Sequence, residues 1–176
     1  MKKKGFTLVE LLAVIAILAI LVIIALPNVM SLFNEAKKNS FNNELKEIYK
    51  TAQNQWMTDS MIETKEINYS RDTSLQCDGA TANKALQLSG RTQLQYGITI
   101  NKAGKVTSYV ATDGTFLYHY TATATDTEGL KIEDIGTASP DEISTGNAII
   151  TLSEKNQSSA TISCAGTSGF TYTTSN

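Results

Sequence analysis

The chain has 176 residues, of which 41% are hydrophobic and 18% are charged, so its composition suits one globular domain with an appendage. This composition excludes collagen, a coiled coil throughout and wholesale disorder. Fifteen basic and 17 acidic residues leave a net charge of −2, so no nucleic-acid-binding surface is indicated, and one His with two Cys excludes the usual zinc site.

The amino-terminal segment has the length and composition of a membrane-spanning helix. Residues 6–26 are apolar except at Thr7 and Glu10, and as a helix they extend about 31 Å, enough to cross a hydrocarbon core. Three lysines in residues 1–5 favour a cytoplasmic amino end, with the rest of the chain outside. A secretory signal peptide is the alternative interpretation. It is disfavoured because the apolar run is long and no small-x-small cleavage pattern follows it.

Glu10 is the unusual residue of this segment. A carboxylate within a membrane helix costs about 2.5–3.5 kcal/mol at the helix centre, and we expect no partner for it in the local sequence. One interpretation places Glu10 close to the lipid headgroups. The other is that cleavage between Gly5 and Phe6 creates a new amine at Phe6, four residues earlier on the same helix face. That amine would pair with a carboxylate of its own chain or of a neighbour.

The run from Gly5 to Glu10, behind a short basic leader, resembles the class III signal of type IV pilins and their relatives, the pseudopilins. Pro27 also lies where many pilins carry a proline. The resemblance implies that a prepilin peptidase cuts after Gly5 and methylates the Phe6 amine. It further implies that Glu10 docks the incoming subunit, and that assembly withdraws the apolar helices from the bilayer into a fibre core.

The helical pattern continues beyond the apolar run. We predict one helix over residues 6–58, with a kink or local melting near residues 23–27 because Pro27 lacks a backbone N–H. Its second half carries an amphipathic stripe that is typical of core packing. The stripe consists of Phe41, Leu45, Ile48, Ala52 and Trp56.

The remaining sequence predicts a connector and an antiparallel sheet. Residues 59–92 show little regular period, so we expect an irregular connector. Residues 93–176 show the alternation and turn signals of a meander whose one face lies on the helix stripe. The five predicted strands are 93–100, 105–111, 115–123, 148–152 and 160–164. The predicted fold class is α+β, a long amino-terminal helix with its second half on an antiparallel sheet, and it resembles the pilin fold.

Signals for chemistry are weak in the rest of the chain. There is no Gly-rich phosphate loop, no HExxH and no EF-hand spacing, and His119 is predicted to face solvent from a strand. A run of acidic residues predicts a solvated loop, with a calcium site as the alternative. These residues are Asp126, Glu128, Glu133, Asp134, Asp141 and Glu142. We therefore predict no enzyme activity, no cofactor and no metal.

Cys77 and Cys164 are the two cysteines of the chain. Exposure outside the cytoplasm favours a disulfide between them, and a bridge would resemble the disulfide loop of many pilins. Two unpaired thiols, with Cys164 buried beside Ile162, are the alternative.

These patterns predict a structural subunit of a type IV pilus. The resemblance implies three partners: the prepilin peptidase, the pilus assembly machinery and further copies of the chain in a homopolymeric filament. The precursor would cross the bacterial cytoplasmic membrane once, head outward, and then join an extracellular fibre for motility, adhesion, biofilm formation or DNA uptake. Alternatives are a minor pilin, a pseudopilin of a type II secretion or competence system, a membrane-anchored surface binding module, and a membrane-anchored enzyme.

Overall fold

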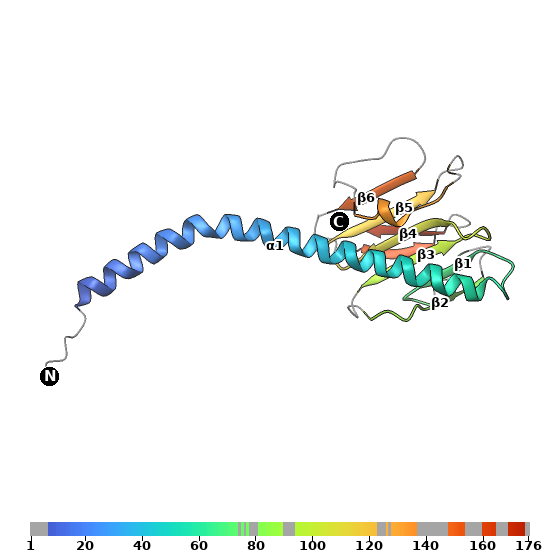
Figure 1. The fold of residues 1–176 in the computed structure, drawn as a ribbon, viewed down its shortest axis with the longest axis horizontal. Helices are drawn as coiled ribbons and strands as arrows, with labels where there is room; N and C mark the ends of the chain where they lie inside the picture. Colours follow the sequence, from blue (N-terminus) through green and yellow to red (C-terminus); the bar gives the residue numbers. More distant parts are fainter. Residues whose placement is uncertain are drawn as a thin grey trace. The chain divides into compact units, whose positions relative to one another are not determined.

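The computed structural model describes residues 7–73, 75, 77, 81–89, 94–122, 126, 128–136, 148–153, 160–164 and 169–174. The chain divides into two compact units, Met1–Asn39 and Ser40–Asn176, and each is described by itself. One helix, α1 (Leu8–Asp59), begins in the first unit and ends in the second (Figure 1).

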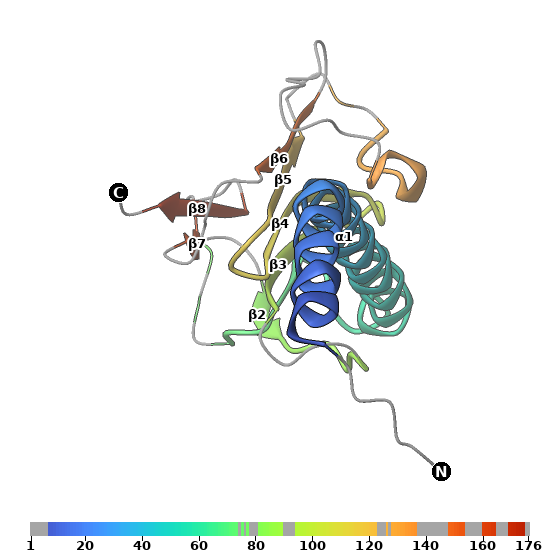
Figure 2. The ribbon, with the colours of Figure 1, turned by 90° about the vertical axis from the view of Figure 1, so that its left-hand side faces the viewer.

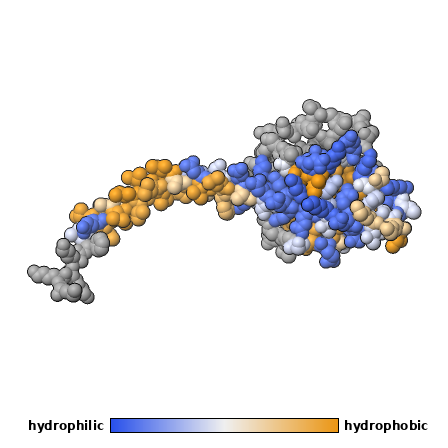
Figure 3. Space-filling view, in the orientation of Figure 1, coloured by the Kyte–Doolittle hydropathy of each residue, from blue (hydrophilic) through white to orange (hydrophobic). Residues whose placement is uncertain are grey.

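In the first unit, α1 carries an apolar surface that nothing in the unit covers. Its large apolar side chains are more than half exposed from Leu8 to Phe33, and Figure 3 shows the resulting hydrophobic stretch. Within the described residues, α1 is the one helix long and apolar enough to cross a membrane. The α-helix is continuous through Pro27, so of the two alternatives predicted near residues 23–27 local melting is wrong, and a kink stays a prediction. A proline removes one hydrogen bond, and the long flanking stretches of α1 keep the helix formed across that gap.

The second unit is built on a six-stranded sheet in the order β2-β1-β3-β4-β5-β6. The sheet is antiparallel except for the parallel pair β1–β2. Its strands are β1 (Ile67–Ser70), β2 (Thr81–Lys84), β3 (Gln95–Ile100), β4 (Val106–Thr112), β5 (Leu117–Ala122) and β6 (Ala148–Ser153). A short 3₁₀ helix, Ile132–Asp134, lies between β5 and β6 in sequence. The predicted α+β class, one long helix followed by a mainly antiparallel sheet, is confirmed.

The predicted helix stripe forms one side of the core. Phe41, Leu45, Ile48 and Ala52 are at most 1% exposed. Phe41 stacks on Phe116 with 5.7 Å between ring centroids, and the Tyr109 hydroxyl donates a hydrogen bond of 2.9 Å to the Leu45 carbonyl. Side chains spaced three and four apart on α1 therefore contact alternate residues of β4 and its neighbours. This packing follows from the period of 3.6 residues in a helix and of two residues in a strand.

The expectation of an irregular connector over residues 59–92 is wrong, because β1 and β2 form there. All four residues of β1 are buried, so β1 lacks the alternation that marks a half-exposed strand. The end of α1 helps hold both strands. The Asp59 carboxylate accepts a 2.9 Å hydrogen bond from the Tyr69 hydroxyl on β1 and lies 3.1 Å from the Lys84 ammonium on β2.

A separate two-stranded sheet, β7 (Ala160–Cys164) with β8 (Phe170–Thr174), covers the other face of the main sheet. Figure 2 shows α1 on one side of the main sheet and this hairpin on the other. Residues 160–164 are thus not the last strand of the meander as predicted. Thr99 of β3 and Ser108 of β4 are buried beneath the hairpin, where the two hydroxyls are hydrogen-bonded to each other.

His119 lies on this second face and is half-buried, not solvent-facing as predicted. Its ring packs edge-on against Tyr172 of β8, with 5.2 Å between ring centroids. Its Nε2 also shares a 2.9 Å hydrogen bond with the Thr121 hydroxyl. The alternation of β5 placed His119 on the correct face, but the cover over that face comes from a strand that no pattern identified.

Candidate processing and assembly segment

The first turn of α1 is closed by a reciprocal set of hydrogen bonds. The Thr7 amide and the Thr7 hydroxyl each donate to the Glu10 carboxylate at 2.9 Å, and the Glu10 amide donates to the Thr7 hydroxyl at 3.3 Å. The Thr7 carbonyl accepts the first helical hydrogen bond, from the Leu11 amide. Thr7 is therefore the N-cap residue and Glu10 occupies the N3 position of a capping box.

This geometry supplies Glu10 with local donors, whereas the sequence had suggested that it had none. The signal was readable: Thr7 and Glu10 have the T-x-x-E spacing of a capping box, immediately before an apolar run. In an apolar medium the carboxylate is costly when unsatisfied, and two donors from its own first turn reduce that cost. The same contacts fix the direction of the carboxylate relative to the helix start.

The predicted cleavage and methylation residues, Gly5 and Phe6, lie outside the described residues. The proposed pairing of a Phe6 amine with Glu10 therefore stays a prediction. Glu10 and Pro27, the two predicted assembly residues, are both exposed on α1 within the first unit. Glu10 lies in the first turn of the helix and Pro27 lies after the long apolar run.

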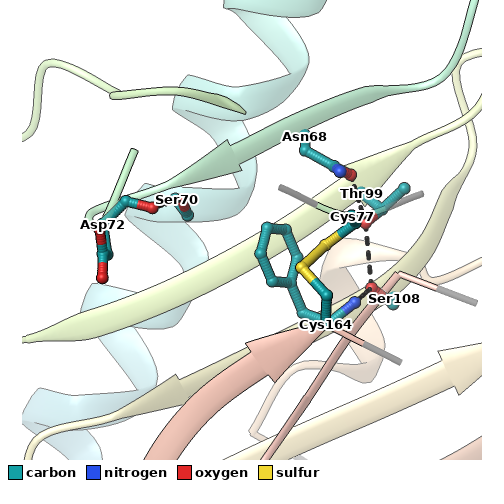
Figure 4. Close-up of a disulfide and its surroundings, with 8 residues drawn as sticks. Asn68, Ser70, Asp72, Cys77, Thr99, Ser108 and Cys164 are labelled. Carbon is teal, nitrogen blue, oxygen red and sulfur yellow. Dashed lines mark hydrogen bonds between the residues drawn. A yellow bond between two sulfur atoms is a disulfide. The ribbon is translucent and has the colours of Figure 1, made fainter. Parts of the chain in front are cut away.

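The structure joins Cys77 and Cys164 by a disulfide, with 5.1 Å between their Cα atoms (Figure 4). Cys77 is 7% exposed and belongs to a second apolar cluster on the hairpin side of the main sheet. The bridge links the segment between β1 and β2 to the end of β7, so it fastens the hairpin to the body of the second unit.

In the described part of the acidic region, Glu128 and Glu133 are exposed as predicted for a solvated loop, whereas Asp126 and Asp134 are half-buried and the segment is anchored to the core. Leu130 and Ile135 are buried in the core, and the Tyr49 hydroxyl donates to the Leu130 carbonyl at 2.9 Å. Partial burial of Asp126 opposes its ionisation, but hydrogen bonds from the Tyr120 hydroxyl and two backbone amides outweigh it and lower the pKa of Asp126.

Within the described ranges, no three acidic, His or Cys side chains group as a metal site. Asp141 and Glu142 of the predicted acidic loop lie outside those ranges.

Residues 1–26 match the family described as the prokaryotic N-terminal methylation motif, the signal of type IV pilins and pseudopilins. No curated protein and no solved structure matches the chain. The motif implies processing by a prepilin peptidase and assembly into a filament in general terms, and with the apolar helix it fits a membrane-anchored precursor. The family that carries this signal is a structural pilin or pseudopilin type.

Proposed function

We propose that the chain is the major subunit of a type IV pilus. In this proposal, a prepilin peptidase cuts after Gly5 and methylates the Phe6 amine. The mature chain then polymerises into a surface fibre that serves motility, adhesion, biofilm formation or DNA uptake. The observation that carries the proposal is a carboxylate, Glu10, held by a capping box at the start of an uncovered apolar helix.

The apolar helix surface requires a covering, and two coverings are available. Burying one large apolar side chain is worth about 1.5–3 kcal/mol relative to water, so the stretch from Leu8 to Phe33 does not stay in water. Hydrocarbon tails cover it in the precursor, and the helices of other copies cover it in the fibre. Because lipid is about as apolar as a leucine side chain, exchanging one covering for the other yields little hydrophobic free energy.

Glu10 supplies the preference for the fibre in this proposal. In the uncleaved precursor, the described donors to its carboxylate are those of its own first turn. In the fibre it gains the positive charge of a Phe6 amine, and a charge-assisted hydrogen bond in an apolar medium is stronger than a neutral one. Pairing at one fixed position along each helix also sets the axial stagger between subunits.

Mass spectrometry of the mature chain tests the processing step. We expect a chain that begins at methylated Phe6. A chain that retains residues 1–5, or one cut beyond residue 26, would contradict the proposal.

Substitution of Glu10 tests the assembly step. We expect Glu10→Ala to abolish surface fibres in electron micrographs while the precursor still reaches the membrane. Glu35→Ala is the matched control, because Glu35 is an exposed acid on the same helix outside residues 6–26. Normal fibre yield from Glu10→Ala would argue against the pairing.

Deletion of the gene separates the pilus from the pseudopilin alternative. Loss of long surface fibres with normal protein secretion supports a major pilin, whereas loss of secretion with intact fibres supports a pseudopilin. Binding of a surface ligand by cells that never form fibres would support the anchored binding module.

A further inference from the structure

The hairpin β7–β8 is attached to the second unit differently from every strand of the main sheet. Among the residues that the structure describes, β1 to β6 are joined by backbone ladders, whereas β7 and β8 pair only with each other. In the described residues, the hairpin is held to the rest of the second unit by an apolar cluster, by the ring contact between His119 and Tyr172, by a backbone-to-side-chain hydrogen bond and by the disulfide.

The apolar contacts of the hairpin form a cluster distinct from the helix-side core. Alternation along the strands sends Tyr109 and Tyr118 to the core under α1 and sends Val110 and Leu117 to the other face. There Val110 and Leu117 meet Ile162 of β7 and Phe170 of β8. The packing of the main sheet on α1 therefore uses a different set of side chains from this second cluster.

The polar contact of the hairpin is a buried chain of hydrogen bonds across four strands. The Phe170 amide donates to the Ser108 hydroxyl at 2.8 Å, which donates to the Thr99 hydroxyl at 3.1 Å. The Thr99 hydroxyl donates in turn to the Asn68 side-chain oxygen at 2.8 Å. The three acceptors are at most 1% exposed (Figure 4). Such a chain fixes the position of a closed hairpin, and water satisfies the same groups once the hairpin opens.

We propose that β7–β8 is a disulfide-latched cover, which opens as a unit when a dithiol reduces the Cys77–Cys164 bridge while the helix–sheet core stays folded. The inference rests on the second unit alone and is independent of the proposed filament function. Opening would expose Val110 and Leu117, which are at most 1% exposed in the closed state. The cover would therefore change an apolar surface of the second unit from buried to solvent-exposed.

The chemistry of opening is thiol–disulfide exchange with a dithiol. One thiolate of the dithiol attacks the sulfur of Cys164, which is the more exposed of the two cysteines. The Cys77–Cys164 bond breaks, and Cys77 leaves as a thiolate that takes a proton from water. The second thiol of the reagent then attacks the mixed disulfide and releases Cys164, so the dithiol ends as a cyclic disulfide.

Hydrogen exchange of the full chain in detergent micelles, with and without excess dithiothreitol, tests the cover. After reduction we expect backbone amides of β7 and β8 to exchange at least about tenfold faster. Amides of β3, β4 and residues 41–52 of α1 should change by less than about twofold. Unchanged exchange in β7–β8 would overturn the proposal, and so would equal acceleration in both groups, since the hairpin would then not be a separate unit.

A variant without the bridge controls for direct effects of the reagent. In the double variant Cys77→Ser with Cys164→Ser, hairpin amides should exchange fast before and after dithiothreitol is added. A dithiothreitol response that persists in this variant would overturn the latch. Because the main experiment starts from the folded oxidised chain, its outcome does not depend on whether the variant folds.

Discussion

At the scale of single residues, Thr7 has two roles at the start of α1. Its hydroxyl donates to the Glu10 carboxylate and accepts the Glu10 amide, so it caps the helix and orients the acid together. We expect Thr7→Val, which keeps the shape but loses the hydroxyl, to destabilise the first turn by about 0.5–2 kcal/mol.

Amide exchange over residues 8–11 in micelles measures this effect at the first turn. Thr7→Ser is the matched control because it keeps the hydroxyl, and it should exchange like the parent chain. Equal protection in the Val and Ser variants would show that the capping box contributes nothing.

His119 makes the stability of the second unit depend on pH. Burial lowers the pKa of His119 below its ordinary value of 6.5. Between that lower pKa and 6.5, the unfolded chain therefore binds more protons than the folded chain. The free energy of unfolding therefore falls as the pH drops below 6.5 towards the lower folded pKa. Asp59 and Asp126, whose pKa values are lowered from 3.8, act in a separate and more acidic window.

Denaturant unfolding of the parent chain and of His119→Gln checks this prediction. We expect the parent to lose stability between about pH 7.5 and about pH 5.5, and the Gln variant to lose less, because an amide does not titrate there. Parallel losses in both proteins would assign the pH dependence to other groups.

At the scale of elements, the packing of the hairpin on the main sheet requires a glycine at position 97. A Cβ at Gly97 on β3 would lie 2.5 Å from the Phe170 ring, so no side chain fits between β3 and β8. We expect Gly97→Ala to lower the free energy of unfolding by about 1–3 kcal/mol through overpacking.

The second variant, Gly97→Ala with Phe170→Leu, makes room for the added methyl group. Its loss should be smaller than the sum of the two single losses, as a double-mutant cycle from denaturant titrations measures. Strict additivity would mean that the two residues do not contact each other in solution.

Elements with a clean period were predictable, and those without one were not. The stripe from Phe41 to Ala52 and the alternation around Tyr96 and Tyr118 gave the helix and the central strands of the sheet. Strand β1 was missed because it is short and buried on both faces, and β8 because a Thr- and Ser-rich tail resembles a loop. The docking of β7 outside the meander depends on contacts distant in sequence, such as Phe170 against Gly97, which no local period encodes.

The candidate site was predictable for a different reason. A carboxylate within an apolar run is rare enough to identify Glu10 directly, and the flanking Gly5 and Phe6 made the signal specific. Thr7 was overlooked even though its spacing from Glu10 is a known helix-start signature. The structure adds the directions and distances of the hydrogen bonds between Thr7 and Glu10, which the spacing alone does not give.

At the scale of the whole molecule, the two units face different surroundings. The first carries the uncovered apolar stretch of α1 with Glu10 in its first turn, and the second has two apolar clusters, one on each face of the main sheet. Substitutions in the first unit should therefore affect insertion and assembly, whereas those in the second should affect folding. Each class can be scored independently, by fibre yield and by denaturant unfolding respectively.

The span of the disulfide has a mechanical consequence. Cys77 and Cys164 are separated by 87 positions, so the enclosed polypeptide cannot lengthen under tension while the bridge is intact. Fully extended, that length would be roughly 300 Å. Optical-tweezer stretching of the chain from its two ends should therefore show about 300 Å of additional extension after reduction. Identical force–extension traces for the oxidised and the reduced chain would refute this expectation. A difference of the expected size would mean that, under load, the oxidised second unit releases only part of its contour length.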